Sequence, residues 1–115
     1  MSPSLFSAAG ASFEIHEWSG SGTATLHVHY SDDEAWHVLH GELTFRYADR
    51  SETASPGTTV FVPAGTPHTY TAAPDARYLI ILTPRLSALI KALQSDHDPS
   101  HPHEIYKRFN SELLE

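Results

Sequence analysis

Short runs in which apolar and polar residues alternate fill the sequence from Phe13 to Leu82. Such alternation is typical of β-strands that bury one face. Gly, Pro, Ser and Asp cluster between the runs and predict turns, for example at residues 19–22 and 55–57. The expected strands cover residues 13–18, 23–30, 35–39, 42–47, 58–62, 68–71 and 77–82. Their length and spacing predict an all-β fold, a small barrel or sandwich.

The apolar pattern changes its period after Leu82. Thr83 and Pro84 predict an N-cap and a first helical position. Apolar residues then follow at helical spacing: Leu86, Leu89, Ile90 and Leu93. A second helical stripe over residues 103–114 consists of Ile105, Tyr106, Phe109 and Leu113. We therefore predict one domain, with a β-barrel over residues 13–82 and a two-helix extension over residues 83–115 that packs outside the barrel or against a partner subunit.

The composition limits which metal ligands and which partners the protein can have. The chain of 115 residues contains no cysteine, so disulfides, thiolate nucleophiles and cysteine-bound metals are excluded. Its formal net charge is -7, whereas a nucleic-acid groove needs basic residues to displace phosphate counterions. Any metal ligands must therefore be nitrogen or oxygen atoms, and we expect no nucleic-acid partner.

The apolar runs are all short. None approaches the roughly 18 residues that a membrane-spanning helix requires. The first twelve residues lack the basic region and the apolar stretch of a signal peptide. We expect a soluble, cytoplasmic protein with no membrane partner.

Two histidines in the expected strand over residues 23–30 stand two positions apart. Side chains alternate across a strand, so His27 and His29 share one face, roughly 6.6 Å apart along it. Two imidazoles on one face can bind one ion, although an isolated pair also fits a solvated polar face. This pair is followed by Glu34 and, beyond a Pro-Gly turn, by His68. Three imidazoles and one carboxylate suggest a metal site.

The spacing of these residues forms two ordered blocks. The first is Gly22-x4-His27-x-His29-x4-Glu34-x6-Gly41, and the second is Gly57-x5-Pro63-x-Gly65-x2-His68. Together they resemble the two motifs of the cupin family. The leading glycine stands one residue from its usual separation, and Ala72 occupies a position where the family pattern often has Asn.

The resemblance implies a jelly-roll barrel, also described as a double-stranded β-helix, whose motif side chains converge on one divalent metal. It places His27, His29, Glu34 and His68 at the four ligand positions. Independently of the resemblance, such donors suit a transition metal, namely Fe, Mn, Ni, Cu or Zn, whereas Ca and Mg favour mostly oxygen ligands. Four protein ligands leave one or two positions open on such an ion, which favours catalysis or ligand binding over a purely structural metal.

Strand alternation also nominates the surroundings of the site. If Glu34 faces the interior of the barrel, Trp36 and His40 should face it too, because they lie at even spacings along the same strand. In the same way, Tyr70 should share the inward face of His68. We interpret Trp36 and Tyr70 as substrate-binding residues, with barrel filling as the alternative. His40 is a candidate acid or base, with a solvated turn residue as the alternative, and Glu34 is expected to serve as both metal ligand and base.

Three classes of function remain open. The leading hypothesis is a metal-dependent enzyme acting on a small oxygenated organic molecule, an oxygenase resembling quercetin dioxygenase-like cupins. A redox-neutral isomerase, epimerase or lyase acting on a sugar or keto acid is the alternative enzyme. A non-catalytic binding module and a purely structural protein are the other classes. Edge strands and the apolar pair Leu5 and Phe6 suggest a homodimer.

Overall fold

Two antiparallel sheets form the barrel of the protein. A computed structural model describes residues 6–23, 25–95 and 102–115. The first sheet has the order β1 (Ser7–Ala9), β2 (Glu14–Ser19), β10 (Arg77–Leu82), β5 (Glu34–His40) and β8 (Thr59–Val62). The second has the order β11 (Ser111–Leu113), β4 (His27–His29), β9 (His68–Ala72), β6 (Leu43–Tyr47) and β7 (Ser51–Ala54), with β3 (Gly22–Thr23) also paired to β9. The predicted all-β jelly-roll class is confirmed.

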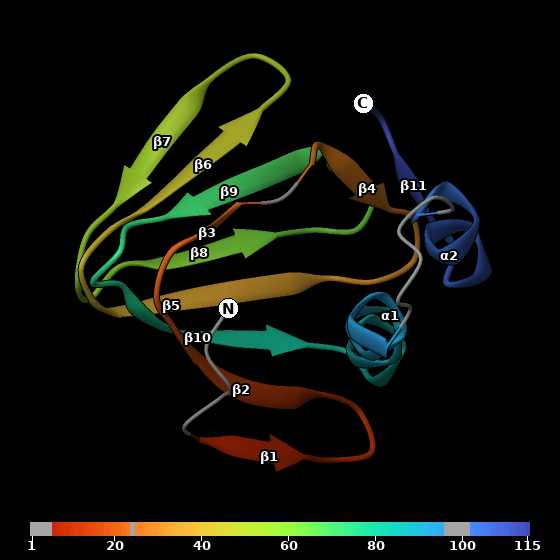
Figure 1. The fold of residues 1–115 in the computed structure, drawn as a ribbon, viewed down its shortest axis with the longest axis horizontal. Coiled ribbons are helices and arrows are strands. Elements are labelled where there is room, and N and C mark those ends of the chain that lie inside the picture. The colour runs from red at the N-terminus through yellow and green to blue at the C-terminus, as the bar shows by residue number, and fades with distance from the viewer. Residues whose placement is uncertain (1–5, 24, 96–101) are drawn as a thin grey trace.

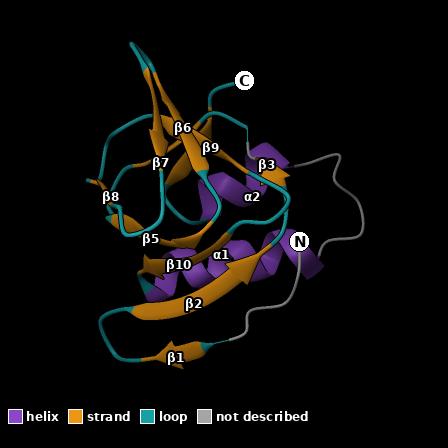
Figure 2. Cartoon of the chain, turned by 90° about the vertical axis from the view of Figure 1, so that its left-hand side faces the viewer, coloured by secondary structure: helices purple, strands orange, loops and turns teal. Residues whose placement is uncertain are grey.

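The helices α1 (Pro84–Ser95) and α2 (Pro102–Arg108) lie together at one end of the strands (Figure 1). Figure 2 looks at the barrel from the opposite end, so that both helices lie behind the strands. Among the described residues, no helix combines the length and apolar character needed to cross a bilayer.

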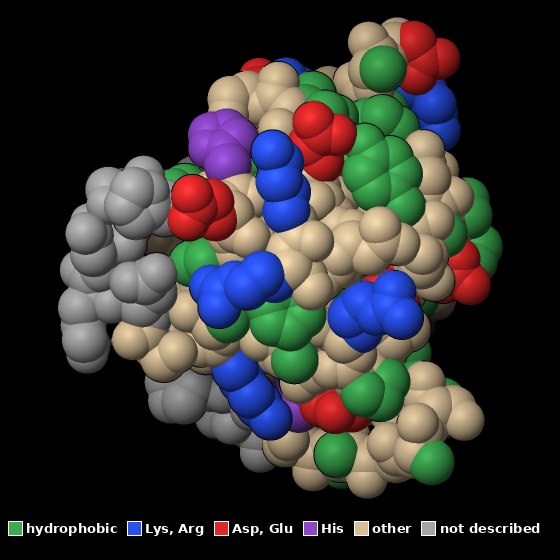
Figure 3. Space-filling model, turned by 90° about the vertical axis from the view of Figure 1, so that its right-hand side faces the viewer, with side chains coloured by type: hydrophobic (Ala, Val, Ile, Leu, Met, Phe, Trp, Pro, Cys, Tyr) green, Lys and Arg blue, Asp and Glu red, His purple; other side chains and the backbone are tan. Residues whose placement is uncertain are grey.

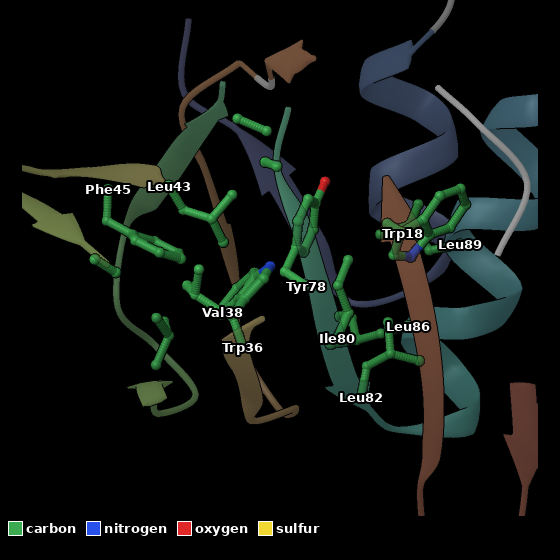
Figure 4. Close-up of a cluster of buried hydrophobic side chains, with 14 of the residues drawn as sticks. Trp18, Trp36, Val38, Leu43, Phe45, Tyr78, Ile80, Leu82, Leu86 and Leu89 are labelled. Atoms are coloured by element: carbon green, nitrogen blue, oxygen red, sulfur yellow. The ribbon is translucent and has the colours of Figure 1, made fainter. Parts of the chain in front are cut away.

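The inward faces of the strands supply the core. Trp36 and Val38 of β5 lie opposite Ile80 and Tyr78 of β10, so the alternating pattern of each strand places both pairs inside the barrel. The ring of Phe45 on β6 meets that of Trp36 with the centroids 5.0 Å apart. Burial of each such large side chain contributes roughly 1.5–3 kcal/mol. Figure 4 shows this layer reaching from Phe45 and Leu43 across to α1.

Helix α1 begins where the sequence predicts. Thr83 Oγ1 accepts a hydrogen bond from the Leu86 amide at 3.2 Å, which confirms the N-cap. The same hydroxyl donates to Asp32 Oδ1 at 3.0 Å and so ties the helix start to the β4–β5 loop. Leu86 and Leu89 are buried and lie beside Ile80 and Trp18 (Figure 4). Because of this packing, α1 closes one end of the barrel.

The second predicted helix is too long. Residues 103–114 were expected to be helical, but α2 ends at Arg108 and a strand, β11, follows at Ser111–Leu113. Asn110 adopts a left-handed conformation with φ of 53°, which ends the helix. The chain then pairs with β4, and this sheet pairing overrides the helical periodicity of the apolar residues.

The expected strand over residues 23–30 is also interrupted. Both β3 and β4 pair with β9, but their registers differ by one residue: Gly22 lies opposite Ala72, whereas His27 lies opposite His68. The connecting residues include Ala24, which lies outside the described residues. Strands β1 and β7 complete the sheets and were not expected from the sequence.

Candidate metal centre

Four side chains from both sheets meet at the end of the barrel closed by the helices. His27 and His29 lie on β4, His68 begins β9, and Glu34 begins β5. Strands β4 and β9 belong to the second sheet, where His27 and His68 are direct cross-strand partners. Since β5 belongs to the first sheet, the carboxylate approaches the three imidazoles from the opposite side of the barrel.

The donor atoms of these residues converge. Glu34 Oε1 lies 3.0 Å from His29 Nε2 and 3.1 Å from His68 Nε2. One ligand atom from each of the four side chains lies within 4.8 Å of the others, and all four residues are buried. Side chains at positions 27, 29, 34 and 68 are therefore brought together as the sequence suggests, in an arrangement that could hold one ion.

The other ring nitrogen of each histidine is occupied. His27 Nδ1 donates to the Thr25 carbonyl at 2.6 Å, and His68 Nδ1 donates to the Thr66 carbonyl at 2.9 Å. His29 Nδ1 lies 2.7 Å from Ser111 Oγ. A carbonyl oxygen only accepts hydrogen bonds, so the two carbonyl contacts keep the protons of His27 and His68 on Nδ1 and turn Nε2 toward the cluster. Metal-ligating histidines are commonly oriented in this way.

The electrostatics of the cluster suit a bound cation. Burial, together with the charges of His68 and His29, lowers the pKa of His27 to about 4, so this imidazole is neutral at pH 7. Burial raises the pKa of Glu34, but the imidazoles of His29 and His68, whose Nε2 atoms face its Oε1, outweigh the effect of burial and leave the pKa at about 2. A neutral imidazole and an ionised carboxylate are the forms that bind metal. The donor set of nitrogen and carboxylate oxygen fits a first-row transition metal.

A cavity of about 240 Å³ adjoins the cluster. Its barrel wall consists of Trp18, Gly22, Trp36, Tyr70 and Ile80, and its helical wall consists of Leu86, Leu89, Ile90, Leu93, Gln94 and Tyr106. Most of these side chains are apolar or aromatic. The cavity is therefore suited to a small organic molecule that reaches the cluster with one end.

Both aromatic residues nominated from the sequence line this cavity. Trp36 is buried, with its ring centroid 5.7 Å from that of His68. Tyr70 stands on the same side, and its hydroxyl lies 3.3 Å from that of Tyr78. Burial raises the pKa of Tyr70 well above its usual value, so the hydroxyl keeps its proton and can donate it in a hydrogen bond.

His40 lies away from the cluster. It is the last residue of β5, at the opposite end of the strand from Glu34, and its exposed imidazole lies 3.5 Å from Asp75 Oδ2. The inward alternation expected for His40 fails because the pairing of β5 with β10 shifts register between Arg77 and Tyr78. The structure therefore does not bring this candidate acid or base to the site.

Two residues of the site were missed in the sequence. Tyr106 of α2 faces the histidines, with its ring centroid 5.6 Å from that of His27, and burial together with the charge of Glu34 raises its pKa to about 12. The sequence pattern assigned Tyr106 to an apolar helical stripe. Its hydroxyl, the polar group in that stripe, was the feature that could have pointed to a site residue. Ser111 had no signal, because its contact with His29 depends on a strand that the sequence predicts as helix.

The comparisons with known proteins agree with this geometry. A sequence model of the family described as "Cupin domain" matches residues 13–82. The chain belongs to the cupin family. The recognition made from the two motifs is thereby confirmed, and cupins commonly carry a metal at such a cluster. A search of curated proteins gave no match.

Several solved structures share the fold. A cupin-2 domain protein from Shewanella frigidimarina is 21% identical, with a TM-score of 0.61 over 70% of this chain and 82% of that chain. KdgF from a Halomonas species is also 21% identical, with a TM-score of 0.59 over 67% and 73% of the two chains. The polyketide cyclase RemF from Streptomyces resistomycificus is 28% identical, with a TM-score of 0.51 over 62% of this chain and 52% of that one.

Proposed function

We propose that this cupin is a metal-dependent enzyme that acts on a small oxygenated organic molecule with an apolar body, and that its reaction is an oxygenation. The observation that carries the proposal is the contact between the four-donor cluster and an apolar cavity. A purely structural metal would need no adjoining space, whereas a reactive one needs access for a substrate.

His27, His29, Glu34 and His68 would hold the metal. A divalent transition metal at this position supplies Lewis acidity and coordination sites for oxygen donors. The aromatic rings around the cluster orient a flat ligand, and the leucines of α1 exclude water from the cavity. Glu34, ionised and in contact with two imidazoles, is the group placed to accept a proton from a bound hydroxyl.

The charge of the cavity wall favours neutral substrates over acidic ones. No Lys or Arg belongs to the cavity lining among the described residues. The basic residues of the two helices, Arg85, Lys91, Lys107 and Arg108, are exposed, and basic side chains gather on the face of the molecule that Figure 3 shows. Apart from the metal itself, a keto acid or sugar acid would find no cationic side chain in the lining to pair with its carboxylate. A neutral aromatic or diketone-like molecule fits better.

A redox-neutral reaction is the second candidate. It is favoured by the likeness to the polyketide cyclase RemF, since polyketides combine a carbon-rich body with several oxygen atoms. The same cluster and cavity would serve a ring closure in which Glu34 accepts a proton. The two candidates differ in their need for oxygen.

Oxygen consumption distinguishes these reactions. Protein loaded in turn with each candidate metal is supplied with flavonols, diketones and aromatic diols while dissolved oxygen and product are followed. If the protein is an oxygenase, the wild type should consume oxygen with at least one of these substrates, and the His29→Ala variant should consume none. Product formation in the absence of oxygen would contradict the oxygenase and support the redox-neutral reaction. Binding with no turnover under either condition would indicate a non-catalytic binding module.

We also propose that the protein is a homodimer. On the outward side of the first sheet, cross-strand partners form an apolar row over all five strands: Ala8, Ile15, Ile81, Ala35 and Phe61. Phe61 is 62% exposed, and the nearby Phe13 is 55% exposed. A continuous apolar row across a sheet favours association with a second copy by twofold symmetry.

Light scattering after size exclusion tests the dimer. The wild-type protein should elute as a dimer and Phe61→Glu as a monomer, while Leu114→Glu, at an exposed site just after β11, should leave the dimer intact. A monomeric wild type would contradict the proposal. A cytoplasmic location and the lack of a nucleic-acid partner stay predictions from the sequence.

A further inference from the structure

His29 differs from the other two histidines of the cluster in how its ring is held. His27 and His68 each bond a carbonyl two residues earlier in their own segment. His29 instead bonds the side chain of Ser111, 82 residues away, at 2.7 Å. Residue 111 lies outside the segment 13–82 that matches the family. The orientation of one of the four donors therefore depends on the C-terminal strand.

The direction of this hydrogen bond follows from the second contact of Ser111. Its hydroxyl donates to the Phe109 carbonyl at 3.2 Å. A hydroxyl has one proton, so the oxygen is left to accept a hydrogen bond from His29 Nδ1. Ser111 thereby keeps the His29 proton on Nδ1 and points Nε2 toward Glu34.

The position of Ser111 is itself fixed by the sheet. Ser111 is 2% exposed and lies directly opposite His29 in the antiparallel pair of β11 and β4. Backbone hydrogen bonds flank the pair, from the Tyr30 amide to the Asn110 carbonyl and from the Leu114 amide to the Leu26 carbonyl. The hydroxyl has little freedom to move away from the imidazole.

We propose that Ser111 is a positioning residue for His29, so that the C-terminal segment 102–115 is a working part of the metal centre. This inference rests on the proposed metal site. It predicts that loss of the hydroxyl frees the imidazole to rotate or change tautomer, which weakens metal binding although all four donor side chains remain. Removal of such a hydrogen-bond partner typically weakens metal affinity 10- to 100-fold.

Cobalt binding tests the role of Ser111. Metal-free wild type, Ser111→Ala, Ser111→Thr and Glu112→Gln are titrated with Co(II) against a competing chelator while the visible absorption of the bound ion is followed. Ser111→Ala should bind Co(II) about 10- to 100-fold more weakly, and Ser111→Thr should recover most of the affinity. Glu112→Gln, which alters the exposed contact of the neighbouring residue with Tyr30, should bind like wild type.

Equal affinity of Ser111→Ala and wild type would overturn the positioning role and leave the metal site standing. Absence of Co(II) binding by the wild type would overturn both. Nitrogen-15 NMR of the zinc-loaded wild type provides a second test, which does not depend on whether the variants fold. The proposal predicts a proton on His29 Nδ1 and zinc on Nε2, and the reverse assignment would contradict it.

Discussion

Glu34 Oε1 and His68 Nε2 lie 3.1 Å apart, although their strands belong to different sheets. The contact exists only when the two sheets have closed into the barrel. The candidate metal centre is therefore a product of folding, and the protonation of its members contributes to the stability of the fold.

The metal-free protein should lose stability as the pH falls from about 6.5 to about 4. Burial holds the pKa of His27 at about 4 in the folded state, against 6.5 in the unfolded chain. As the pH falls, the unfolded chain therefore takes up this proton before the folded protein does. The free energy of unfolding should fall by about 3 kcal/mol between pH 6.5 and pH 4. Urea denaturation at a series of pH values measures this loss.

His27→Gln serves as the control, because its side chain does not titrate. Its free energy of unfolding should change less between pH 6.5 and 4 than that of the wild type. An identical pH dependence in the two proteins would contradict the assignment. Below pH 4.5, both proteins should lose further stability because the pKa of Glu34 is held at about 2.

Thr83→Ala should destabilise the protein by about 1–2 kcal/mol. The substitution removes the N-cap of α1 and also the hydrogen bond to the buried Asp32. Thr83→Ser keeps the hydroxyl and should be close to wild type. Chemical denaturation compares the three proteins, and equal stability of Thr83→Ala and wild type would show that the cap is dispensable.

Leu93→Asp should weaken binding of neutral aromatic ligands at least tenfold while leaving metal affinity unchanged. Leu93 lines the cavity from α1, on the wall opposite the barrel strands, so a carboxylate there makes the cavity unfavourable for an apolar ligand. Quenching of tryptophan fluorescence by an aromatic diol reports the binding. Ala88→Asp on the exposed face of the same helix is the matched control. Equal affinities in both variants would place the ligand elsewhere.

His40→Ala should retain wild-type metal content and activity. The imidazole is exposed at the far end of β5 and contacts Asp75 rather than the cluster. A loss of turnover with normal folding would restore the acid or base role that the sequence suggested.

The sequence revealed the parts of the site that depend on local spacing. His27 and His29 could be paired because strand alternation puts both on one face. Glu34 and His68 completed the donor set, and the spacing of the two blocks that contain them resembled the cupin motifs. The exposed position of His40 goes with a register shift between β5 and β10, which alternation within one strand cannot reveal.

The C-terminal contribution was hidden for a related reason. The apolar residues Ile105, Tyr106, Phe109 and Leu113 fit a helical period, yet pairing with β4 decides the conformation after Asn110. A contact such as that between Ser111 and His29 depends on this long-range pairing. The sequence alone could place neither Ser111 nor the ring of Tyr106 at the cluster.

Metal content is the most direct test of the central claim that these four side chains form a metal centre. Elemental analysis should be made on wild type, His68→Ala and the control His37→Ala, each purified anaerobically. His37 faces away from the cluster and bonds Thr59. We predict about one transition-metal ion per chain in wild type and control, and almost none in His68→Ala. Full metal content in His68→Ala, or none in the wild type after reloading with each candidate metal, would contradict the account.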